Sequence, residues 1–442
     1  MIPNHIDVIS MGCSKNLIDS ERLLRRLKAK GYTVTHNPED VGGEYVVVNT
    51  CGFIADAKEE SINLLLSLAE LKDSGKIGRI VAMGCLTQRY RDVLDKEIPE
   101  IDIVYGKFDW KNFIDSLEDR SGAPAPREWE RTLTTPPHSC YIKISEGCDR
   151  FCAFCAIPLI TGRHISRPME EILEETRRLA AGGVREFNVI AQDLSSYGTD
   201  LYGEHRLAAL IDAMAEVEGV EWIRLHYAYP ADFPMDILDV MARRSNVCKY
   251  LDIALQHSSD KMLKAMRRHI SAAETERLLD EIRRRVPGIR IRTTLMVGFP
   301  GEEEEDFDNL MDFVRNRRFD RMGAFAYSEE EDTYAARHYA DNVPEEVKQR
   351  RLDTLMALQQ DISAELSEEL VGKRLRLLVD EREGDYALCR SEWDSPEVDL
   401  TFHVRCGAQP GEFIEATVTR AEEFDLFAET GPIQDDYTDN NI

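Results

Sequence analysis

The stretch EGCDRFCAFC, residues 146–155, places three cysteines in the spacing C-x₃-C-x₂-C, at Cys148, Cys152 and Cys155. Thiolates are the soft ligands that iron–sulfur clusters require. The motif supplies three of them, whereas a cubane has four irons, so one iron is left open to a ligand from outside the chain. The sequence therefore predicts a [4Fe–4S] site with one open iron.

Two other interpretations of this triplet remain open. Positions i, i+4 and i+7 share one face of a helix, so cysteines at this spacing can form a buried helical stripe. Gly147 and Asp149, on either side of the first cysteine, weigh against an apolar stripe. Zinc is the second alternative, although a zinc site normally has a fourth protein ligand or a water molecule.

The triplet follows the first strand candidate of an alternating strand–helix series that runs from residue 139 to about residue 328. The six strand candidates are SCYIKIS, REFNVIAQD, EWIRLHYAYP, KYLDIALQH, IRIRTTLMVGF and RMGAFAYS. Helix-prone stretches separate them. Six such units predict a partial (β/α)6 barrel, whose functional loops lie at the carboxyl ends of its strands.

A second alternating series precedes the triplet. HIDVISMGC, EYVVVNTC and GRIVAMGC are strand candidates, and helical patterns follow at residues 16–30, 55–71 and from residue 86. This alternation predicts an open, mostly parallel α/β sheet covered on both faces. Cys13, Cys51 and Cys85 each end one strand, at the edge where open α/β sheets bind ligands. We therefore predict a shared metal site there; three small buried thiols are the alternative.

The remaining segments define the predicted domain limits. Residues 119–138 are rich in proline, glycine and charge, which indicates a linker. A long helix is predicted at residues 344–370, and the segments KRLRLLVDE, YALCRSE, DLTFHVR, EFIEATVTRAE and FDLFAE after it predict a small β-barrel. We expect an N-terminal α/β domain at residues 1–125, the partial barrel at 138–368 and the β-barrel at 371–436.

Composition narrows the function classes. The net charge of −27 disfavours a protein that binds by neutralising phosphates, and it favours either a basic partner or simple solubility. The first residues, MIPNHIDVIS, do not resemble a signal peptide, and no apolar run reaches 18 residues. We therefore expect a cytoplasmic protein without a membrane span. Ten cysteines in that setting favour metal or redox chemistry over disulfides.

The pattern C-x₃-C-x-Phe-C, with Phe154 before the last cysteine, resembles the radical S-adenosylmethionine (SAM) superfamily. The resemblance implies that the amino and carboxylate groups of SAM bind the open iron. One electron then cleaves SAM to methionine and a 5′-deoxyadenosyl radical, which abstracts a hydrogen from the substrate. The barrel would supply orientation and exclude water.

Nearly all of residues 5–430 resembles the methylthiotransferases, which combine an N-terminal domain with a second [4Fe–4S] cluster, a radical SAM barrel and a small β-barrel called TRAM. Cys13, Cys51 and Cys85 stand at the matching positions in GCSKN, NTCGFI and GCL. The resemblance implies that the second cluster delivers sulfur, which one SAM methylates, while a second SAM generates the radical. It assigns the six cysteines as cluster ligands and implies an electron donor such as flavodoxin or ferredoxin. No side chain is assigned as a catalytic acid or base.

Two branches of this family differ in substrate. GCSKNLIDSE, VVNTCGFI and EGCDRFCAFCAIPLITGRHISRP are similar to the RimO branch, which modifies the β-carbon of an aspartate of ribosomal protein S12. The MiaB-like branch, which modifies adenosine in tRNA, more often shows GCQMNxxDSE and NTCxVR. Ser14 is a departure, because the RimO branch usually has proline there. The tRNA enzyme and a non-catalytic iron–sulfur electron carrier remain the alternative functions.

Charge bears on the substrate independently of the resemblance. Residues 371–442 contain 7 Lys and Arg against 17 Asp and Glu, a net charge of −10. A TRAM domain that binds RNA should be basic, because phosphate contacts supply most of that affinity. This segment is therefore expected to bind a basic ribosomal protein and not RNA. An acidic solvated surface without a partner is the alternative.

Further residues are candidates for contacts with SAM or substrate. They lie at the carboxyl ends of the barrel strands or beside the triplet: Gly298, Pro300 and Gly301; Gln192 and Asp193; Gln256 and His257; Lys143 and Arg163. A tight turn is the alternative for the glycine-rich segment, and a structural role is the alternative for His257. Four cysteines without partner spacing are expected to be buried thiols: Cys140, Cys248, Cys389 and Cys406.

Overall fold

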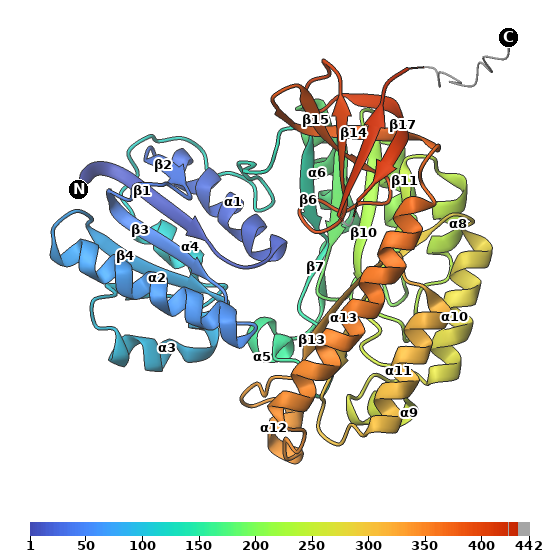
Figure 1. Cartoon of the computed structure of the whole chain (residues 1–442). Coiled ribbons are helices and arrows are strands. Elements are labelled where there is room, and N and C mark those ends of the chain that lie inside the picture. The colour runs from blue at the N-terminus through green and yellow to red at the C-terminus, as the bar shows by residue number, and fades with distance from the viewer. Residues whose placement is uncertain (423, 432–442) are drawn as a thin grey trace, which may run out of the picture.

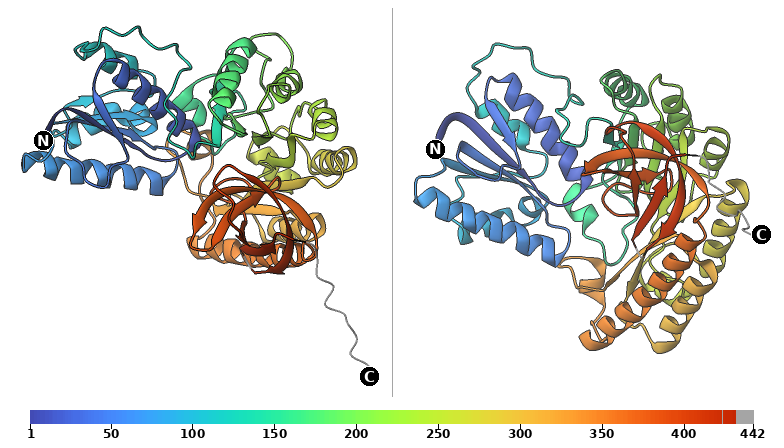
Figure 2. Two further views of the ribbon diagram at one scale, coloured as in Figure 1. Left: turned by 90° about the horizontal axis from the view of Figure 1, so that it is seen from above. Right: turned by 45° about the horizontal axis from the view of Figure 1, so that its top comes forward.

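The computed structural model describes residues 1–422 and 424–431 of the chain. Three units follow one another along the sequence, an α/β unit, a larger central unit and a small β-barrel (Figure 1). The further views in Figure 2 show the first and the last of these packed against the central unit. Within the described ranges, no helix is long and apolar enough to cross a membrane.

The N-terminal unit is a five-stranded parallel sheet with helices on both faces. Its order is β2-β1-β3-β4-β5, and the strands span Ile2–Ser10 (β1), Thr33–His36 (β2), Gly43–Thr50 (β3), Arg79–Gly84 (β4) and Ile103–Val104 (β5). Helices α1 (Ser14–Ala29) and α4 (Trp110–Ser116) cover one face, and α2 (Ala55–Asp73) and α3 (Cys85–Glu97) cover the other. Each face has its own apolar cluster, as expected for a sheet buried on both sides.

The central unit is a six-stranded parallel sheet that curves without closing. Its order is β13-β12-β11-β10-β9-β6, and the strands span Ser139–Lys143 (β6), Glu186–Ile190 (β9), Trp222–Ala228 (β10), Val247–Ile253 (β11), Arg290–Val297 (β12) and Arg321–Ala326 (β13). The connecting helices lie on its outer side: α6 (Met169–Ala181), α7 (Leu207–Ala215), α8 (Ile237–Arg243), α10 (Ala272–Arg285) and α11 (Glu304–Arg317). Helix α13 (Glu345–Glu368) packs along β13 and leads to the last unit.

Short elements complete the loops of this unit: β7 (Ser145–Glu146), α5 (Ile157–Thr161), β8 (Ile165–Ser166), α9 (Asp260–Ala265) and α12 (Tyr334–His338). The last unit is a closed barrel of order β14-β15-β16-β18-β17, with strands at Arg374–Glu383 (β14), Tyr386–Ser391 (β15), Thr401–Arg405 (β16), Phe413–Ala421 (β17) and Asp425–Glu429 (β18). It contacts the amino-terminal ends of the central strands, where Arg390 pairs with Glu186 and Arg321 pairs with Asp394.

The predicted fold class is confirmed. An open α/β unit, a partial barrel of six parallel strands and a small closed β-barrel all form. Strands β2 and β5 were not predicted; the first has four residues and the second two. The domain limits stay a prediction, and residues 423 and 432–436 of the last predicted domain lie outside the described residues.

Candidate active site at the junction of the three units

The loop that carries Cys148, Cys152 and Cys155 lies between β7 and α5 and has no helical structure, which excludes the helical-stripe interpretation. Gly147, with φ +79°, allows its tight start, because a Cβ atom there would collide with the backbone oxygen of Arg163. The backbone N–H of Cys148 donates to Gly162 O at 3.2 Å. The loop is thereby folded back onto the segment that follows α5.

A buried cation lies against this cysteine loop. Arg268 donates from Nη1 to Cys152 Sγ at 3.1 Å, and its guanidinium stacks 4.1 Å from the ring of Tyr229. Burial raises the pKa of Cys148 to about 12 and also raises the pKa of Cys155. Free thiols would stay protonated in such a place, whereas metal ligation removes the proton. A positive charge beside buried sulfur therefore fits an anionic cluster.

The three N-terminal cysteines lie at the carboxyl ends of β1, β3 and β4, as predicted. A Cβ atom on Gly12 would lie 2.7 Å from Cys51 Sγ, so Cys51 packs directly against the residue before Cys13. Asn16 ties these strand ends together. Its Nδ2 donates to the backbone oxygens of Met11 at 3.1 Å and Thr50 at 3.0 Å, and its Oδ1 lies 3.7 Å from the sulfur of Cys85.

The local charges act differently on these three thiols. Cys13 is exposed; the surrounding protein tends to raise its pKa, but Lys15, the backbone N–H of Asn16 and Lys107 outweigh this effect and lower the pKa. Burial raises the pKa of Cys85 to about 12 despite Lys107, and burial also raises the pKa of Cys51.

In the described part of the chain, no three cysteine, histidine or carboxylate side chains converge on one metal ion. In a cubane each thiolate would bind a different iron, so three thiolates need not converge on one point. The assignment of the six cysteines as cluster ligands stays a prediction.

A buried network of charges connects the two cysteine regions. Asp19 on α1 accepts hydrogen bonds from Lys107 at 2.6 Å and from Lys143 on β6 at 2.5 Å. Lys143 also pairs with Glu146, two residues before Cys148, at 2.7 Å. Lys143, a sequence candidate for contact with SAM or substrate, is thus committed to an ion-pair network at the junction of two units.

Some of the other residues predicted to contact SAM or substrate already have protein partners, and others have side-chain atoms without one. Asp193 accepts from Arg150 Nε at 2.7 Å, and the exposed Arg163 pairs with Asp149. Gln192 Oε1 and Gln256 Oε1 are buried without a hydrogen-bond partner among the described protein atoms, whereas His257 Nε2 faces Glu302 Oε1 at 3.9 Å. The two amide oxygens lie just beyond the carboxyl ends of β9 and β11, so they remain available to a polar ligand.

The glycine-rich segment after β12 forms a tight turn. Glu302 accepts from the backbone N–H groups of Gly298 and Phe299, and the N–H of Gly301 donates to Asn342 Oδ1 at 2.8 Å. Pro300 lies between them. Of the four thiols expected to be buried, Cys140, Cys248 and Cys389 are buried, whereas Cys406 is only partly so; it lies just beyond β16, where the barrel wall ends.

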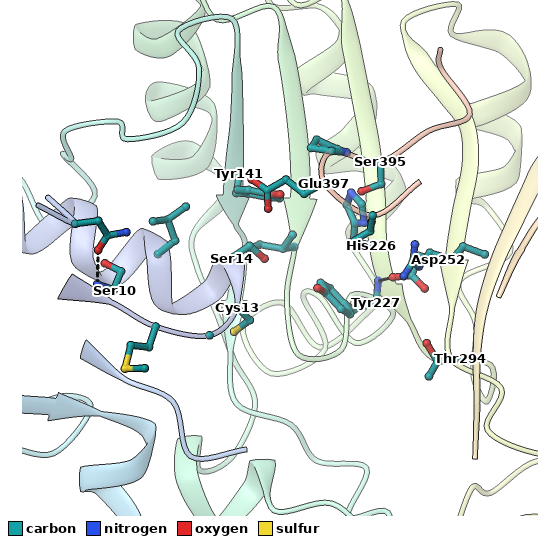
Figure 3. A pocket seen from close by; sticks show the side chains of 18 residues that line it. Ser10, Cys13, Ser14, Tyr141, His226, Tyr227, Asp252, Thr294, Ser395 and Glu397 are labelled. Carbon is teal, nitrogen blue, oxygen red and sulfur yellow. Dashed lines mark hydrogen bonds between the residues drawn. The ribbon is translucent and has the colours of Figure 1, made fainter. Parts of the chain in front are cut away.

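A cavity of about 410 Å³ opens where the three units meet (Figure 3). Cys13 lines it from the β1–α1 loop, Tyr227 and Asp252 line it from β10 and β11, and residues 395–398 line it from the small β-barrel. Tyr227 adopts φ +65°, which is unusual for an aromatic residue and common at functional sites. The residue is 38% exposed.

Sequence reasoning did not single out Tyr227, Asp252, Arg292 or Lys15. The first three lie within the predicted strands EWIRLHYAYP, KYLDIALQH and IRIRTTLMVGF. Charged or polar residues inside otherwise apolar strands were the available signal, because strands of a buried parallel sheet are usually apolar throughout.

Three family models match the chain. They are the Radical SAM superfamily at residues 142–314, Uncharacterized protein family UPF0004 at residues 5–106 and the TRAM domain at residues 371–430. Among solved structures, the radical S-adenosylmethionine methyltransferase TsrM from Kitasatospora setae, with cobalamin and a [4Fe–4S] cluster bound, superposes with a TM-score of 0.54. It is 14% identical and covers 88% of this chain and 81% of its own, so it supports the fold alone.

Curated relatives match almost the whole chain. A protein from Phocaeicola vulgatus is 56% identical over 430 residues, 96% of this chain and 99% of that one. One from Bacteroides thetaiotaomicron is 57% identical over 428 residues, 96% and 97% of the two chains. One from Flavobacterium johnsoniae is 48% identical over 432 residues, 96% and 98% of the two chains. All three are named ribosomal protein uS12 methylthiotransferase RimO. With a radical SAM domain, which implies SAM and a [4Fe–4S] cluster, and this identity over nearly its full length, the chain belongs to the RimO family of radical SAM methylthiotransferases.

Proposed function

We propose that this enzyme replaces a hydrogen on the β-carbon of an aspartate of ribosomal protein S12 with a methylthio group, using two [4Fe–4S] clusters and SAM. One cluster would be held by Cys148, Cys152 and Cys155, and the other by Cys13, Cys51 and Cys85. The observation that carries the proposal is the cavity of about 410 Å³, which joins the cysteine-bearing edge of the N-terminal sheet to the inner face of the barrel. Its size suits one substrate side chain and its neighbours.

The residues around each trio suit these groups. Arg268 supplies a buried positive charge to the sulfur of Cys152, and Lys107 supplies one near Cys13 and Cys85. The unpartnered buried amide oxygens of Gln192 and Gln256 suit the amino and hydroxyl groups of SAM, which can donate hydrogen bonds to them. When bound, the clusters and SAM supply the radical that removes the hydrogen and the sulfur and methyl group that replace it.

The chain itself contributes orientation and exclusion of water. The Asp19 network holds α1 against β6, so the two cysteine regions keep a fixed separation. Residues 395–398 of the small β-barrel close one side of the cavity, which limits access of water to the reacting carbon. We also propose domain limits of 1–125, 138–368 and 371–436.

The choice of S12 rests on the printed name of the relatives and on charge. Residues 371–442 carry a net charge of −10, which suits a basic ribosomal protein and repels RNA phosphates. We place the reaction in the cytoplasm, with a flavodoxin or ferredoxin as the electron donor. Whether S12 is met free or within the small ribosomal subunit does not change this proposal.

The decisive experiment is mass spectrometry of S12 from cells with and without this protein. Loss of the mass of one methylthio group in its absence supports the proposal, and an unchanged S12 rejects the substrate. Hypomodified tRNA adenosine in the same cells would favour the tRNA enzyme. Reduced protein that yields no 5′-deoxyadenosine from SAM would favour an electron carrier.

Iron content tests the cluster assignment separately. Anaerobically reconstituted protein should contain about eight irons per chain, and replacement of Cys13, Cys51 or Cys85 by alanine should lower this to about four. These variants should still cleave SAM but form no methylthio product. Cys140→Ala is the matched control, because Cys140 is a buried cysteine outside both trios.

A further inference from the structure

A lysine beside the cavity at the junction of the three units forms no ion pair with any carboxylate that the structure describes. Arg292 on β12 lines the cavity, but Asp399 of the small β-barrel pairs with it at 2.8 Å. Lys15, in the first turn of α1, lies against the ring of the cavity residue Tyr227. Among the residues that the structure describes, no carboxylate forms an ion pair with Lys15, whose ammonium lies 3.1 Å from the centroid of that ring.

The backbone of Tyr227 holds this ring in place. With φ at +65° the residue is strained, and its N–H donates to Asp252 Oδ2 at 3.3 Å while its carbonyl accepts from the N–H of Leu194 at 3.1 Å. The ammonium of Lys15 therefore has a fixed position against this ring, whereas most surface lysines extend into water. Cation–π contact holds the ammonium without cancelling its charge, so the ammonium can still bind an anion.

Lys15 also lies close to the reaction centre implied by the proposed function. It is two residues from Cys13, and its charge acts on Cys13, Asp252 and His226, all of which line the cavity. An anion bound to Lys15 would thus lie between the sulfur-bearing edge of the N-terminal sheet and the inner face of the barrel.

We propose that the ammonium of Lys15 binds the side-chain carboxylate of the substrate aspartate and so selects aspartate as the residue to be modified. The inference rests on the proposed function. The carboxylate carbon of aspartate is bonded directly to the β-carbon, so fixing the carboxylate also fixes the reacting carbon. Asparagine has the same shape without the charge, so its amide oxygen accepts only a weaker hydrogen bond from the ammonium.

The test is a double-mutant cycle between enzyme and substrate. Affinity of the reconstituted holoenzyme is measured for S12 and for S12 in which the modified aspartate is replaced by asparagine. The wild-type enzyme should prefer aspartate roughly tenfold, in keeping with one charge-assisted contact at a partly exposed site. Lys15→Met should abolish this preference, and Lys15→Arg should retain most of it.

Lys28→Met is the matched control, because it removes an exposed lysine from the far end of the same helix and should keep the full preference. Iron content and circular dichroism establish that each variant folds and holds its clusters. In steady state, Lys15→Met should raise KM for S12 more than it lowers kcat.

The outcomes separate the two proposals. If the wild-type enzyme methylthiolates S12 but Lys15→Met prefers aspartate over asparagine as strongly as the wild type, the inference is wrong and the proposed function stands. If the wild-type enzyme neither binds nor modifies S12, both are overturned.

Discussion

Lys143 on β6 donates a hydrogen bond of 2.5 Å to Asp19 on α1, and this contact joins the N-terminal unit to the barrel. The second oxygen of Asp19 accepts from Lys107 at 2.6 Å. Both lysines are buried, so their positive charges are compensated by the carboxylates of Asp19 and Glu146 and not by water. The attraction of Lys107 and Lys143 keeps the pKa of Asp19 well below its usual range even though burial alone would raise it.

Asp19→Asn should therefore weaken the junction. Two buried ammonium groups would lose most of their compensation, at a cost of about 3 kcal/mol in the free energy of unfolding. The two cysteine regions would also lose their fixed separation, so the ratio of 5′-deoxyadenosine to methylthio product should rise. Urea unfolding and product analysis measure the two effects. Asp115→Asn removes an exposed carboxylate from α4 and is the control; equal stability of the two variants would contradict the prediction.

Asp252 should make the protein less stable as the pH rises, whereas most carboxylates in folded proteins do the reverse. Burial raises its pKa from 3.8 to about 6, against the attraction of Arg292. A raised folded-state pKa means that stability is fully present below the unfolded pKa and is lost as pH rises through the folded one. The ionised group thus destabilises the fold at neutral pH. Replacing Asp252 with asparagine would remove that penalty, while the side-chain oxygen could still accept the N–H of Tyr227.

The Asp252→Asn variant should be more stable than the wild type by about 3 kcal/mol above pH 6, and the gain should vanish near pH 4. Urea unfolding at a series of pH values measures this directly. A difference in stability that is the same at every pH would show that Asp252 does not titrate in this way.

Replacing Arg268 should change the reduction potential of the cluster proposed at Cys148, Cys152 and Cys155. Its guanidinium donates to Cys152 Sγ, and a buried positive charge stabilises the more negative, reduced form of a cluster. Arg268→Met should shift the reduction potential to a more negative value and slow SAM cleavage roughly tenfold. A redox titration followed by electron paramagnetic resonance measures the potential. Arg268→Lys should recover part of the shift, and Arg277→Met, at an exposed site on α10, should leave the potential unchanged.

Long alternating segments made most of the fold predictable. The six strands of the barrel and the five of the small β-barrel each contain a run of apolar or alternating residues, and all eleven form. Strand β2, Thr33–His36, escaped prediction because it is short and lies at the sheet edge with half-buried side chains. Strand β5 has two residues, too few for any periodicity.

The candidate site was predictable only in part. The rule that ligands bind at the carboxyl ends of parallel strands brought Cys13, Cys51 and Cys85 to one edge. It gives no distances between separate units, however. The contact of Lys15 with Tyr227 depends on how the N-terminal sheet docks on the barrel, and this docking is decided by side-chain pairs such as Asp19 with Lys143. The sequence did not reveal this docking either, so Lys143 was predicted to contact SAM or substrate although it pairs with Asp19.

The ion pairs of Arg390 should hold the small β-barrel against the central unit. It pairs with Glu186 on β9 at 2.7 Å and with Asp380 on β14 at 2.6 Å, and it is buried. Burial works to raise the pKa of Glu186, but Arg390 and Arg224 hold it well below its usual range. Arg390→Met should cost about 3 kcal/mol, because a buried carboxylate loses its principal partner.

The same variant should also loosen the wall that residues 395–398 contribute to the cavity. We expect faster proteolytic cleavage near residue 371 and a higher KM for S12, while SAM cleavage without substrate is unaffected because the cysteine loop lies at the opposite ends of the strands. Arg405→Met, which removes an exposed arginine from the same barrel, is the control. Unchanged proteolysis and KM in Arg390→Met would mean that the apolar contacts of Trp222 with Phe413 hold the β-barrel without this ion pair.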